Sequence, residues 1–209
     1  MAKVTQAHID ARTKDILDAA MRMFARKGVD DTKMQEIATE AGLSAGAIYR
    51  YFSSKEDLLR GVFAECTEEH RTLFAQAAIG TDSPSEALGE IGRSAWDDFK
   101  REGWRDNVIL NLETALKATR QPEELGAARR EMLSALVELL EGLVEQGQAA
   151  GELDPSMDAQ ALATTLLACH LGSGLLALQL GEQMDTDGVH NIVMGLLESS
   201  ILQPSLAGV

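Results

Sequence analysis

Several residue types that mark other fold and function classes are scarce in this chain of 209 residues. It has 4 prolines, 2 cysteines and 4% aromatic residues, whereas 45% of its residues are apolar. Few aromatic and β-branched residues disfavour a β-sandwich or barrel, and abundant Ala, Leu and Glu predict helices. Two cysteines cannot build a disulfide framework, and the apolar fraction argues against disorder. The length fits one or two small domains with a real core.

Long apolar runs are also scarce. The longest candidate, residues 162–180, is interrupted by His170 and Gln179, and a membrane span needs roughly 18 apolar residues. The polar N-terminus lacks the apolar segment of a secretory leader. We therefore expect a soluble protein with a cytoplasmic location and no membrane partner.

The net charge of −14 is unevenly distributed along the chain. Residues 1–60 carry 10 Lys/Arg and 9 Asp/Glu, whereas residues 61–209 carry 9 and 24. The acidic residues therefore lie almost entirely in the second part. Such asymmetry favours two regions with different tasks, only the first of which could approach nucleic acid.

Hydrophobic periodicity predicts about nine helices and no strand. They are expected near residues 9–27, 32–41, 44–49, 53–78, 83–102, 105–119, 122–147, 154–180 and 189–202. Start signals support four of them. These signals are two capping boxes (Thr32 with Gln35, Ser53 with Glu56), the run Ser83-Pro84-Ser85-Glu86, and Asp154-Pro155.

Residues 37–49 have the spacing of a helix-turn-helix. Ala38 is small where two helices would cross, and Gly42 lies where the turn needs a backbone without a Cβ. Leu43 and Ile48 are expected to point inward and fix the second helix against the first. The outward residues of that second helix could then enter a major groove.

A longer match surrounds this motif, and residues 12–59 resemble the N-terminal domain of the TetR/AcrR family of bacterial transcriptional regulators. The resemblance rests on Ile16, Ala19, Ala20, Phe24, Gly28, Thr32, Ile37, Ala38, residues 41–44, Gly46, residues 48–52, Ser54 and residues 55–58. It implies an all-α fold with an N-terminal three-helix DNA-binding domain over residues 1–53. Residues 54–209 would form a helical ligand-binding and dimerisation domain.

The resemblance assigns phosphate contacts to Tyr49 and Lys55, which would fix register without reading sequence. The start of the second helix at Thr32 would offer backbone N–H groups to an anion. Family members often carry Thr at position 33 and Lys at position 45, where this chain has Lys33 and Ala45. The full DNA-binding prediction is Thr32, Lys33, Gln35, Ser44, Ala45, Gly46, Ala47, Tyr49, Arg50 and Lys55.

Within that set, Ala45, Gly46 and Ala47 offer almost no donors or acceptors, so we expect them to pack on thymine methyl groups. Gln35 and Arg50 would supply the polar readout, with DNA shape contributing the rest. Tyr51 and Phe52 are interpreted as core or hinge residues. The basic residues Arg22, Arg26 and Lys27 are interpreted as a solvated face.

Apolar rows on the last two predicted helices indicate a homodimer interface, as the family uses. The predicted interface residues are Leu162, Leu166, His170, Gly174, Leu178, Ile192, Val193 and Leu196. The alternative is that these rows form the core of a single chain. A dimer would suit palindromic DNA, because two-fold symmetry places two reading heads about one turn apart.

A ligand cavity is expected between residues 61 and 150, where the family keeps one. The candidates for lining it are Cys66, His70, Phe74, Trp96, Phe99, Trp104, Asn107, Asn111 and Met132. Each could instead be ordinary core or surface. Aromatic residues and nearby acids favour an aromatic or cationic effector. Cys66 and His70 share a helix face, but no metal site, cofactor or catalytic motif is predicted.

These features together predict a ligand-responsive regulator that binds palindromic operator DNA as a homodimer and leaves it when a small molecule binds. Repression is the commoner mode in the family. The alternative is a helical protein-interaction module whose helix-turn-helix no longer binds DNA, which a weak salt dependence would favour. A small helical enzyme is the other class considered, and substrate turnover without DNA binding would favour it.

Overall fold

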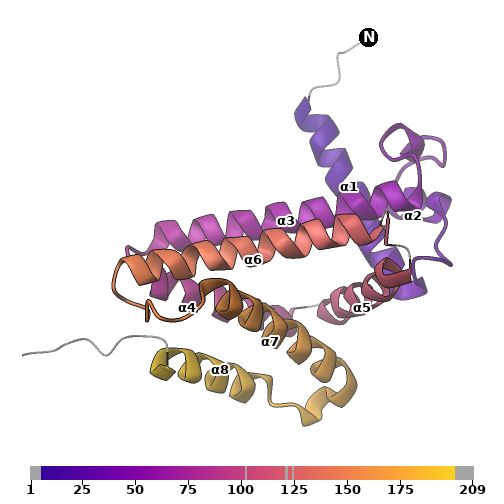
Figure 1. Ribbon diagram of the computed structural model, residues 1–209. Helices are drawn as coiled ribbons and strands as arrows, with labels where there is room; N and C mark the ends of the chain where they lie inside the picture. Colours follow the sequence, from indigo (N-terminus) through magenta and orange to yellow (C-terminus); the bar gives the residue numbers. More distant parts are fainter. Residues whose placement is uncertain (1–5, 102, 121, 124, 201–209) are drawn as a thin grey trace, which may run out of the picture. The chain divides into compact units, whose positions relative to one another are not determined.

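The computed structural model describes residues 6–101, 103–120, 122, 123 and 125–200, and every regular element in these ranges is helical. The α-helices are α1 (Gln6–Lys27), α2 (Met34–Glu40), α3 (Lys55–Gly80), α4 (Pro84–Asp97), α5 (Trp104–Arg120), α6 (Leu125–Ala149), α7 (Ala159–Leu180) and α8 (Thr186–Ser200) (Figure 1). Three 3-10 turns accompany them: η1 (Ile48–Arg50), η2 (Asp98–Lys100) and η3 (Gly181–Gln183). The predicted all-α fold is confirmed.

The helix starts show which sequence signals were decisive. The Ser83 side chain accepts the backbone N–H of Glu86, as the sequence predicts for α4. Ahead of α3, the backbone N–H and hydroxyl of Ser53 donate to Asp57 at 2.8 and 3.0 Å, so the partner is Asp57 and not the expected Glu56. The start of α7 is also later than expected, because Asp158 caps it.

The prediction that Thr32 caps α2 is wrong. Lys33 is the N-cap residue, and its backbone N–H donates to the carboxylate of Glu36 at 3.0 Å. Thr32 is instead only 1% exposed and donates its hydroxyl to the carbonyls of Gly28 and Met23. Burial of the threonine therefore moves the cap by one residue.

Contacts divide the chain into two compact units. Unit 1 comprises Met1–Cys66 and Arg105–Met132, and unit 2 comprises Thr67–Trp104 and Leu133–Val209. The long helices α3 and α6 contribute residues to both units. The expected functional boundary between residues 53 and 54 stays a prediction.

The core of unit 1 joins α1, α2, η1 and the start of α3. Phe24, Ile37, Ile48 and Leu58 are completely buried there. A Cβ on Gly61 would lie 2.8 Å from the ring of Phe52, a distance that real Cβ atoms do not show. Glycine at this position therefore lets α3 approach the segment that follows η1.

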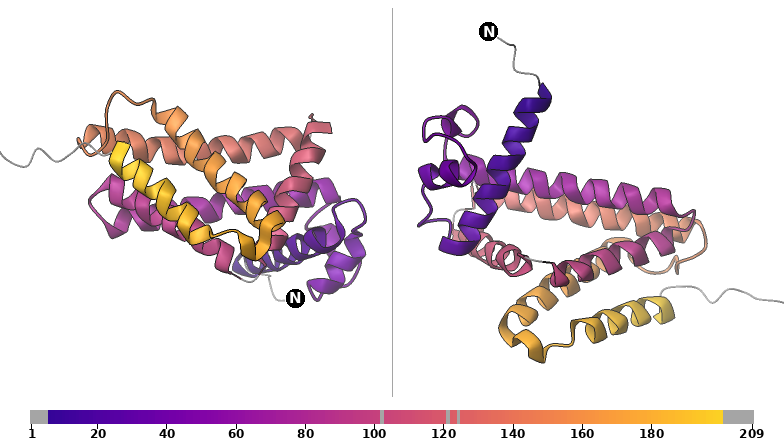
Figure 2. Two further views of the ribbon diagram at one scale, coloured as in Figure 1. Left: turned by 90° about the horizontal axis from the view of Figure 1, so that it is seen from below. Right: turned by 180° about the vertical axis from the view of Figure 1, so that it is seen from behind.

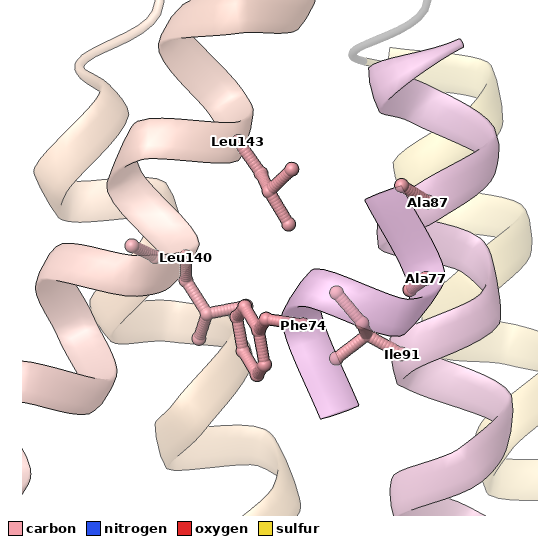
Figure 3. Close-up of a cluster of buried hydrophobic side chains, with 7 residues drawn as sticks. Phe74, Ala77, Ala87, Ile91, Leu140 and Leu143 are labelled. Atoms are coloured by element: carbon pink, nitrogen blue, oxygen red, sulfur yellow. The ribbon is translucent and has the colours of Figure 1, made fainter. Parts of the chain in front are cut away.

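The core of unit 2 is formed by the last turns of α3 together with α4, α6 and α7. Phe74 and Ala77 meet Ala87 and Ile91 of α4 and the leucines of α6 (Figure 3). The helix α8 contacts α4 and α7 (Figure 2). The Trp96 Nε1–H donates to the Thr186 carbonyl at 2.9 Å, which fastens the start of α8 to α4.

Candidate functional site

The turn of the helix-turn-helix follows α2 in unit 1. Gly42 adopts φ of +69°, a left-handed conformation that glycine adopts without a Cβ clash. The Leu43 N–H then donates to the Ala38 carbonyl at 2.7 Å and closes the end of α2. The expected helix at residues 44–49 is a run of turns that ends in η1, which the buried Ile48 fixes to the core.

Most residues assigned to DNA binding lie on the surface of unit 1. The exposed members are Lys33, Gln35, Ser44, Ala45, Gly46, Tyr49 and Arg50. Half of the Tyr49 surface is exposed, although the preceding residue, Ile48, is completely buried. Such exposure is unusual for a large aromatic side chain. This segment therefore offers a tyrosine and an arginine beside a surface of small residues.

Two residues of the DNA-binding prediction face inward and are corrected. The Thr32 hydroxyl is bonded to two backbone carbonyls and is only 1% exposed, so it has no free hydroxyl for a phosphate. Ala47 is 9% exposed, and its methyl group belongs to the core. The turn geometry before η1, which differs from a regular helix, decides which of the small side chains faces out.

Lys55 performs a local structural task. Its ammonium donates to the carbonyls of Val29 and Asp30 at 2.8 and 2.7 Å. These bonds tie the start of α3 to the loop between α1 and α2. The predicted phosphate contact of Lys55 is untested, and any such contact would have to share the ammonium with these two carbonyls.

Five basic residues near α2 and η1 differ in whether a carboxylate pairs with them. Arg22 and Arg26 pair with Glu40, and Lys27 pairs with Glu36 at 2.5 Å. Hydrogen bonds from the two arginines hold the pKa of the Glu40 carboxyl below its ordinary value. Among the described residues, Lys33 and Arg50 are exposed and have no carboxylate within ion-pair distance, and Arg50 follows Tyr49 in η1.

The loop between α1 and α2 is held from α5 as well. The Val29 N–H donates to Glu113 at 3.1 Å, and Lys117 pairs with Asp30. The bond from Lys117 places the pKa of Asp30 below its ordinary value. Gly28 has φ of +81°, and a Cβ there would meet the Glu113 carboxylate at 2.6 Å. The loop that leads into α2 and the helix-turn-helix is therefore fixed on both sides.

Unit 2 contains a cavity of about 550 Å³. Its walls are mainly apolar and come from α3, α4, α6, α7 and α8, with Phe74, Ile91 and Leu140 among them (Figure 3). This volume lies within the range of roughly 300–1,000 Å³ that is typical of small-molecule sites.

An aromatic cluster borders the cavity. The rings of Phe99 and His170 stack at 5.3 Å, and Trp96 meets both edge-on at about 6 Å. Among the described residues, the buried Nδ1 atom of His170 finds no hydrogen-bond partner. Burial lowers the pKa of His170, although the nearby Asp98 opposes this shift, so the imidazole is neutral at pH 7.

The predicted pocket residues divide between the units. His70, Phe74 and Trp96 line the cavity. Phe99 and Trp104 pack edge to face at 5.8 Å within the same unit and do not line it. The remaining candidates, Cys66, Asn107, Asn111 and Met132, belong to unit 1.

Of these four unit 1 candidates, Cys66 is a half-buried free cysteine, and the other three have different surroundings. Asn111 accepts a hydrogen bond at 2.8 Å from the buried guanidinium of Arg129, which also donates to Thr114. Met132 is a core residue, and Asn107 is exposed. The sequence analysis grouped these residues because they lie between residues 61 and 150. It could not show that α3 and α6 each contribute residues to both units. Leu73, Leu88 and Arg93, which line the cavity, were missed.

The predicted dimer residues on α7 require a correction. Leu162, Leu166 and His170 line the internal cavity, and Gly174 is buried. Val193 of α8 also lines the cavity, and Leu178 is half-buried. Leu196 lies outside the residues whose side chains are described. Leu162 and Gly174 are therefore buried within the chain itself, as the alternative of an internal core expects, whereas the assignment of the other residues to a partner stays a prediction.

The outward side of α7 is nevertheless apolar. Leu171, Leu176 and Leu180 are 36%, 51% and 45% exposed, and Ile192 of α8 is 66% exposed.

In the described part of the chain, residues Ala159–Gln183 form one segment that is long and apolar enough to cross a membrane, with a mean hydropathy of 1.7 and 28% of its window buried. His170 and Gln179 therefore interrupt the run less than expected. A single segment of this kind is weak evidence of a membrane helix, because a helix buried in a soluble protein has the same composition.

An exposed helix-turn-helix in one unit and a ligand-sized cavity in the other define a helical DNA-binding regulator with a separate sensor region. Residues 16–62 match the family model "Bacterial regulatory proteins, tetR family", and residues 118–206 match "Tetracyclin repressor-like, C-terminal domain". The chain belongs to the TetR family of transcriptional regulators, which are not enzymes.

Individual relatives resemble the whole chain. The uncharacterized regulator YfiR from Bacillus subtilis is 28% identical over 96% of this chain and 93% of its own length. The solved structure of FadR from Bacillus subtilis in complex with stearoyl-CoA matches with a TM-score of 0.75 and 23% identity, covering 89% of this chain and 97% of FadR. A regulator from Saccharomonospora viridis in complex with choline also gives 0.75 at 23% identity, over 94% of this chain and 100% of its own. The two structures support the fold.

Proposed function

We propose that this protein is a homodimeric repressor that binds palindromic operator DNA through unit 1 and is released when a small molecule occupies the cavity of unit 2. One observation carries the DNA-binding part. Arg50 and Lys33 are exposed cations without an ion-pair partner among the described residues, and Arg50 follows the exposed Tyr49 in η1. The cations Arg22, Arg26 and Lys27, by contrast, are neutralised within the protein.

On this surface, Tyr49, Lys33 and the backbone of residues 44–46 would contact phosphates and fix register. Gln35 and Arg50 would read base edges, and Ala45 would pack on thymine methyl groups. The acidic residues of unit 2 would repel DNA, so only unit 1 would approach the duplex.

The test is fluorescence anisotropy with operator DNA selected from random duplexes and from the gene's own upstream region, at fixed salt. Substitution of Arg50 by Ala should weaken binding by tenfold or more, because a base or phosphate contact is worth roughly 1–3 kcal/mol. The matched control is Arg22→Ala, whose side chain pairs with Glu40 and which should change affinity less than threefold. Equal losses in both variants would contradict the assigned surface. Absence of any selected duplex would favour the protein-interaction alternative.

Gln35→Ala tests sequence readout separately. It should relax the preference at one base position of each half-site while leaving non-specific binding nearly unchanged. A uniform loss on all sequences would make Gln35 a backbone contact.

The dimer would form through the outward sides of α7 and α8. Leu176 and Ile192 are exposed there, on helices whose other residues pack in unit 2. Exposed apolar surface of this kind is typical of an interface. Leu176→Glu should convert the dimer to a monomer in sedimentation velocity, whereas Ile79→Glu, at a residue 85% exposed at the end of α3, should not. A dimer that tolerates Leu176→Glu would contradict this interface.

The regulatory part rests on the cavity. Solved relatives with this fold hold stearoyl-CoA and choline, which supports a ligand-binding role for the corresponding region here. A ligand that couples to DNA binding should lower operator affinity by about 5- to 150-fold. A repressor of chromosomal genes would work in the cytoplasm, which is the location we infer.

A further inference from the structure

The cavity of unit 2 is elongated. Ser85, Gly89 and Trp96 line it from one side of α4, and Leu162, Leu166 and His170 line it from α7. At a rise of 1.5 Å per residue these two rows span about 16 and about 12 Å. Both rows have the same direction, because Leu162 clusters with Leu88 and Leu153 while His170 meets the ring of Trp96. A ligand that fills the cavity must therefore be long and narrow.

The end of this cavity near Trp96 differs in chemistry from its apolar wall. Phe74, Ile91 and Leu140 belong to that wall and offer no hydrogen bonds. The end near Trp96 carries His170, Asp98 and His70. Among the described residues the Nδ1 atom of His170 is buried and has no partner, and buried polar atoms are usually satisfied. A ligand group at this end would supply the missing hydrogen bond.

The charges that border the cavity disfavour an anion. Glu86, Glu90, Asp98 and Glu198 line it, against the single cation Arg93, and Arg93 pairs with Glu90 at 3.4 Å. No Lys or Arg follows Arg130 in the sequence. Unit 2 as a whole has 4 Lys/Arg and 18 Asp/Glu. A ligand carboxylate or phosphate would therefore meet repulsion from these acids, and the one Lys or Arg among the described lining residues, Arg93, is already paired.

We propose that the effector is a long, mainly apolar amphiphile whose head is not anionic and donates a hydrogen bond at the His170 and Asp98 end of the cavity. A hydroxyl or a protonated amine has this chemistry. The neutral imidazole accepts the hydrogen bond at Nδ1, and the Asp98 carboxylate attracts the donor. This inference rests on the proposed function, since it specifies the ligand class of the same cavity. It also separates this protein from a sensor of acyl-CoA, which carries phosphates.

The test is direct binding to the full-length protein by isothermal titration calorimetry, without DNA, so that its outcome is independent of operator recognition. Three probes of equal chain length are used below their aggregation concentrations: dodecylamine, 1-dodecanol and dodecanoate. We expect dodecylamine or 1-dodecanol to bind at least tenfold more tightly than dodecanoate. Tighter binding of the alcohol than of the amine would assign a hydroxyl head. Dodecanoate binding as tightly as the others, or no binding of any probe, would overturn the proposal.

Two neighbouring acids provide a matched pair of variants. Asp98 lines the cavity and pairs with Arg101 at 2.7 Å, whereas Asp97 does not line it and pairs with Lys100 at 3.3 Å, so the two acids differ in their position relative to the cavity and not in having a cationic partner. Both are exposed, so both variants should fold. Asp98→Asn should lower the preference for dodecylamine over dodecanoate at least threefold, and Asp97→Asn should leave it unchanged. His170→Phe keeps the ring and removes Nδ1, and it should weaken amine and alcohol binding alike. Equal effects of the two Asp variants, or unchanged binding in His170→Phe, would contradict the proposed head site.

Discussion

Units 1 and 2 differ in charge, although α3 and α6 contribute to both. Unit 1 has 15 Lys/Arg and 15 Asp/Glu, whereas unit 2 has 4 and 18, so unit 2 accounts for the whole net charge of −14. A region without net charge can approach phosphates through a few exposed cations, while a strongly acidic region cannot. The overall charge of a chain is therefore a poor guide to DNA binding when its two regions have different tasks.

The units also differ in how their interiors are filled. In unit 1, Thr32, Lys55 and Glu113 each hold backbone groups around the loop that leads into α2. In unit 2, a cavity of about 550 Å³ remains, and a histidine nitrogen beside it lacks a partner in the described residues. A region with such a space gains stability when a ligand fills it.

The largest expected effect compares the same substitution in both units. Leu58→Ala in the fully buried core of unit 1 should lower the free energy of unfolding by about 3–5 kcal/mol, because it opens a cavity in a filled core. Leu166→Ala, in the wall of the existing cavity, should cost about 1–2 kcal/mol, since its side chain has fewer neighbours to lose. Urea unfolding followed by circular dichroism, at one protein concentration, measures both. Equal losses would show that the cavity closes around Leu166.

A smaller effect is expected at the loop of unit 1. Glu113→Ala removes the acceptor of the buried Val29 N–H and should destabilise the protein by about 1–3 kcal/mol. Glu113→Gln retains a carbonyl acceptor and should cost less. Lys117→Ala, which breaks a pair with the exposed Asp30, should cost less than about 1 kcal/mol. The same unfolding measurement applies, and a larger loss in Lys117→Ala than in Glu113→Ala would reverse our ranking of these contacts.

The smallest expected effect is a pH dependence of the free energy of unfolding that arises from His170 beside the cavity. Burial places the pKa of His170 below that of the unfolded chain, which is near 6.5. As pH falls through that value the unfolded chain takes up a proton first, so stability is lost until the folded pKa is reached. His170→Phe should therefore lose less stability than the natural protein between pH 7 and pH 5.5, by up to about 1 kcal/mol. Parallel stability curves for the two proteins would contradict a buried neutral imidazole.

Local sequence signals predicted those features that depend on neighbouring residues. The helix-turn-helix spacing predicted that Gly42 forms the turn and that Ile48 is buried, and both predictions are confirmed. The run from Ser83 to Glu86 predicted the start of α4 correctly. Composition and periodicity likewise predicted an all-α chain. These features follow from backbone conformation and from side chains within a few positions, so one sequence contains the needed information.

Features that depend on which side of a helix meets a distant segment were harder to predict. Leu162, Leu166 and His170 form an apolar row that suits a partner subunit and a cavity equally well, and in the folded chain these three residues line the cavity. Thr32 was predicted to cap α2, but its side chain is buried in the core. Cys66 and Asn111 were grouped with His70, although they belong to unit 1.

The sequence by itself determined the helices, the turn of the DNA-binding motif and the asymmetry of charge, because each follows from local spacing or from counting. Only the tertiary structure decided which cations remain unpaired, which apolar row faces inward, and where the cavity lies. Those outcomes depend on contacts between residues far apart in the chain, such as Glu113 with Val29 and Trp96 with His170, and helical periodicity alone does not select among such contacts.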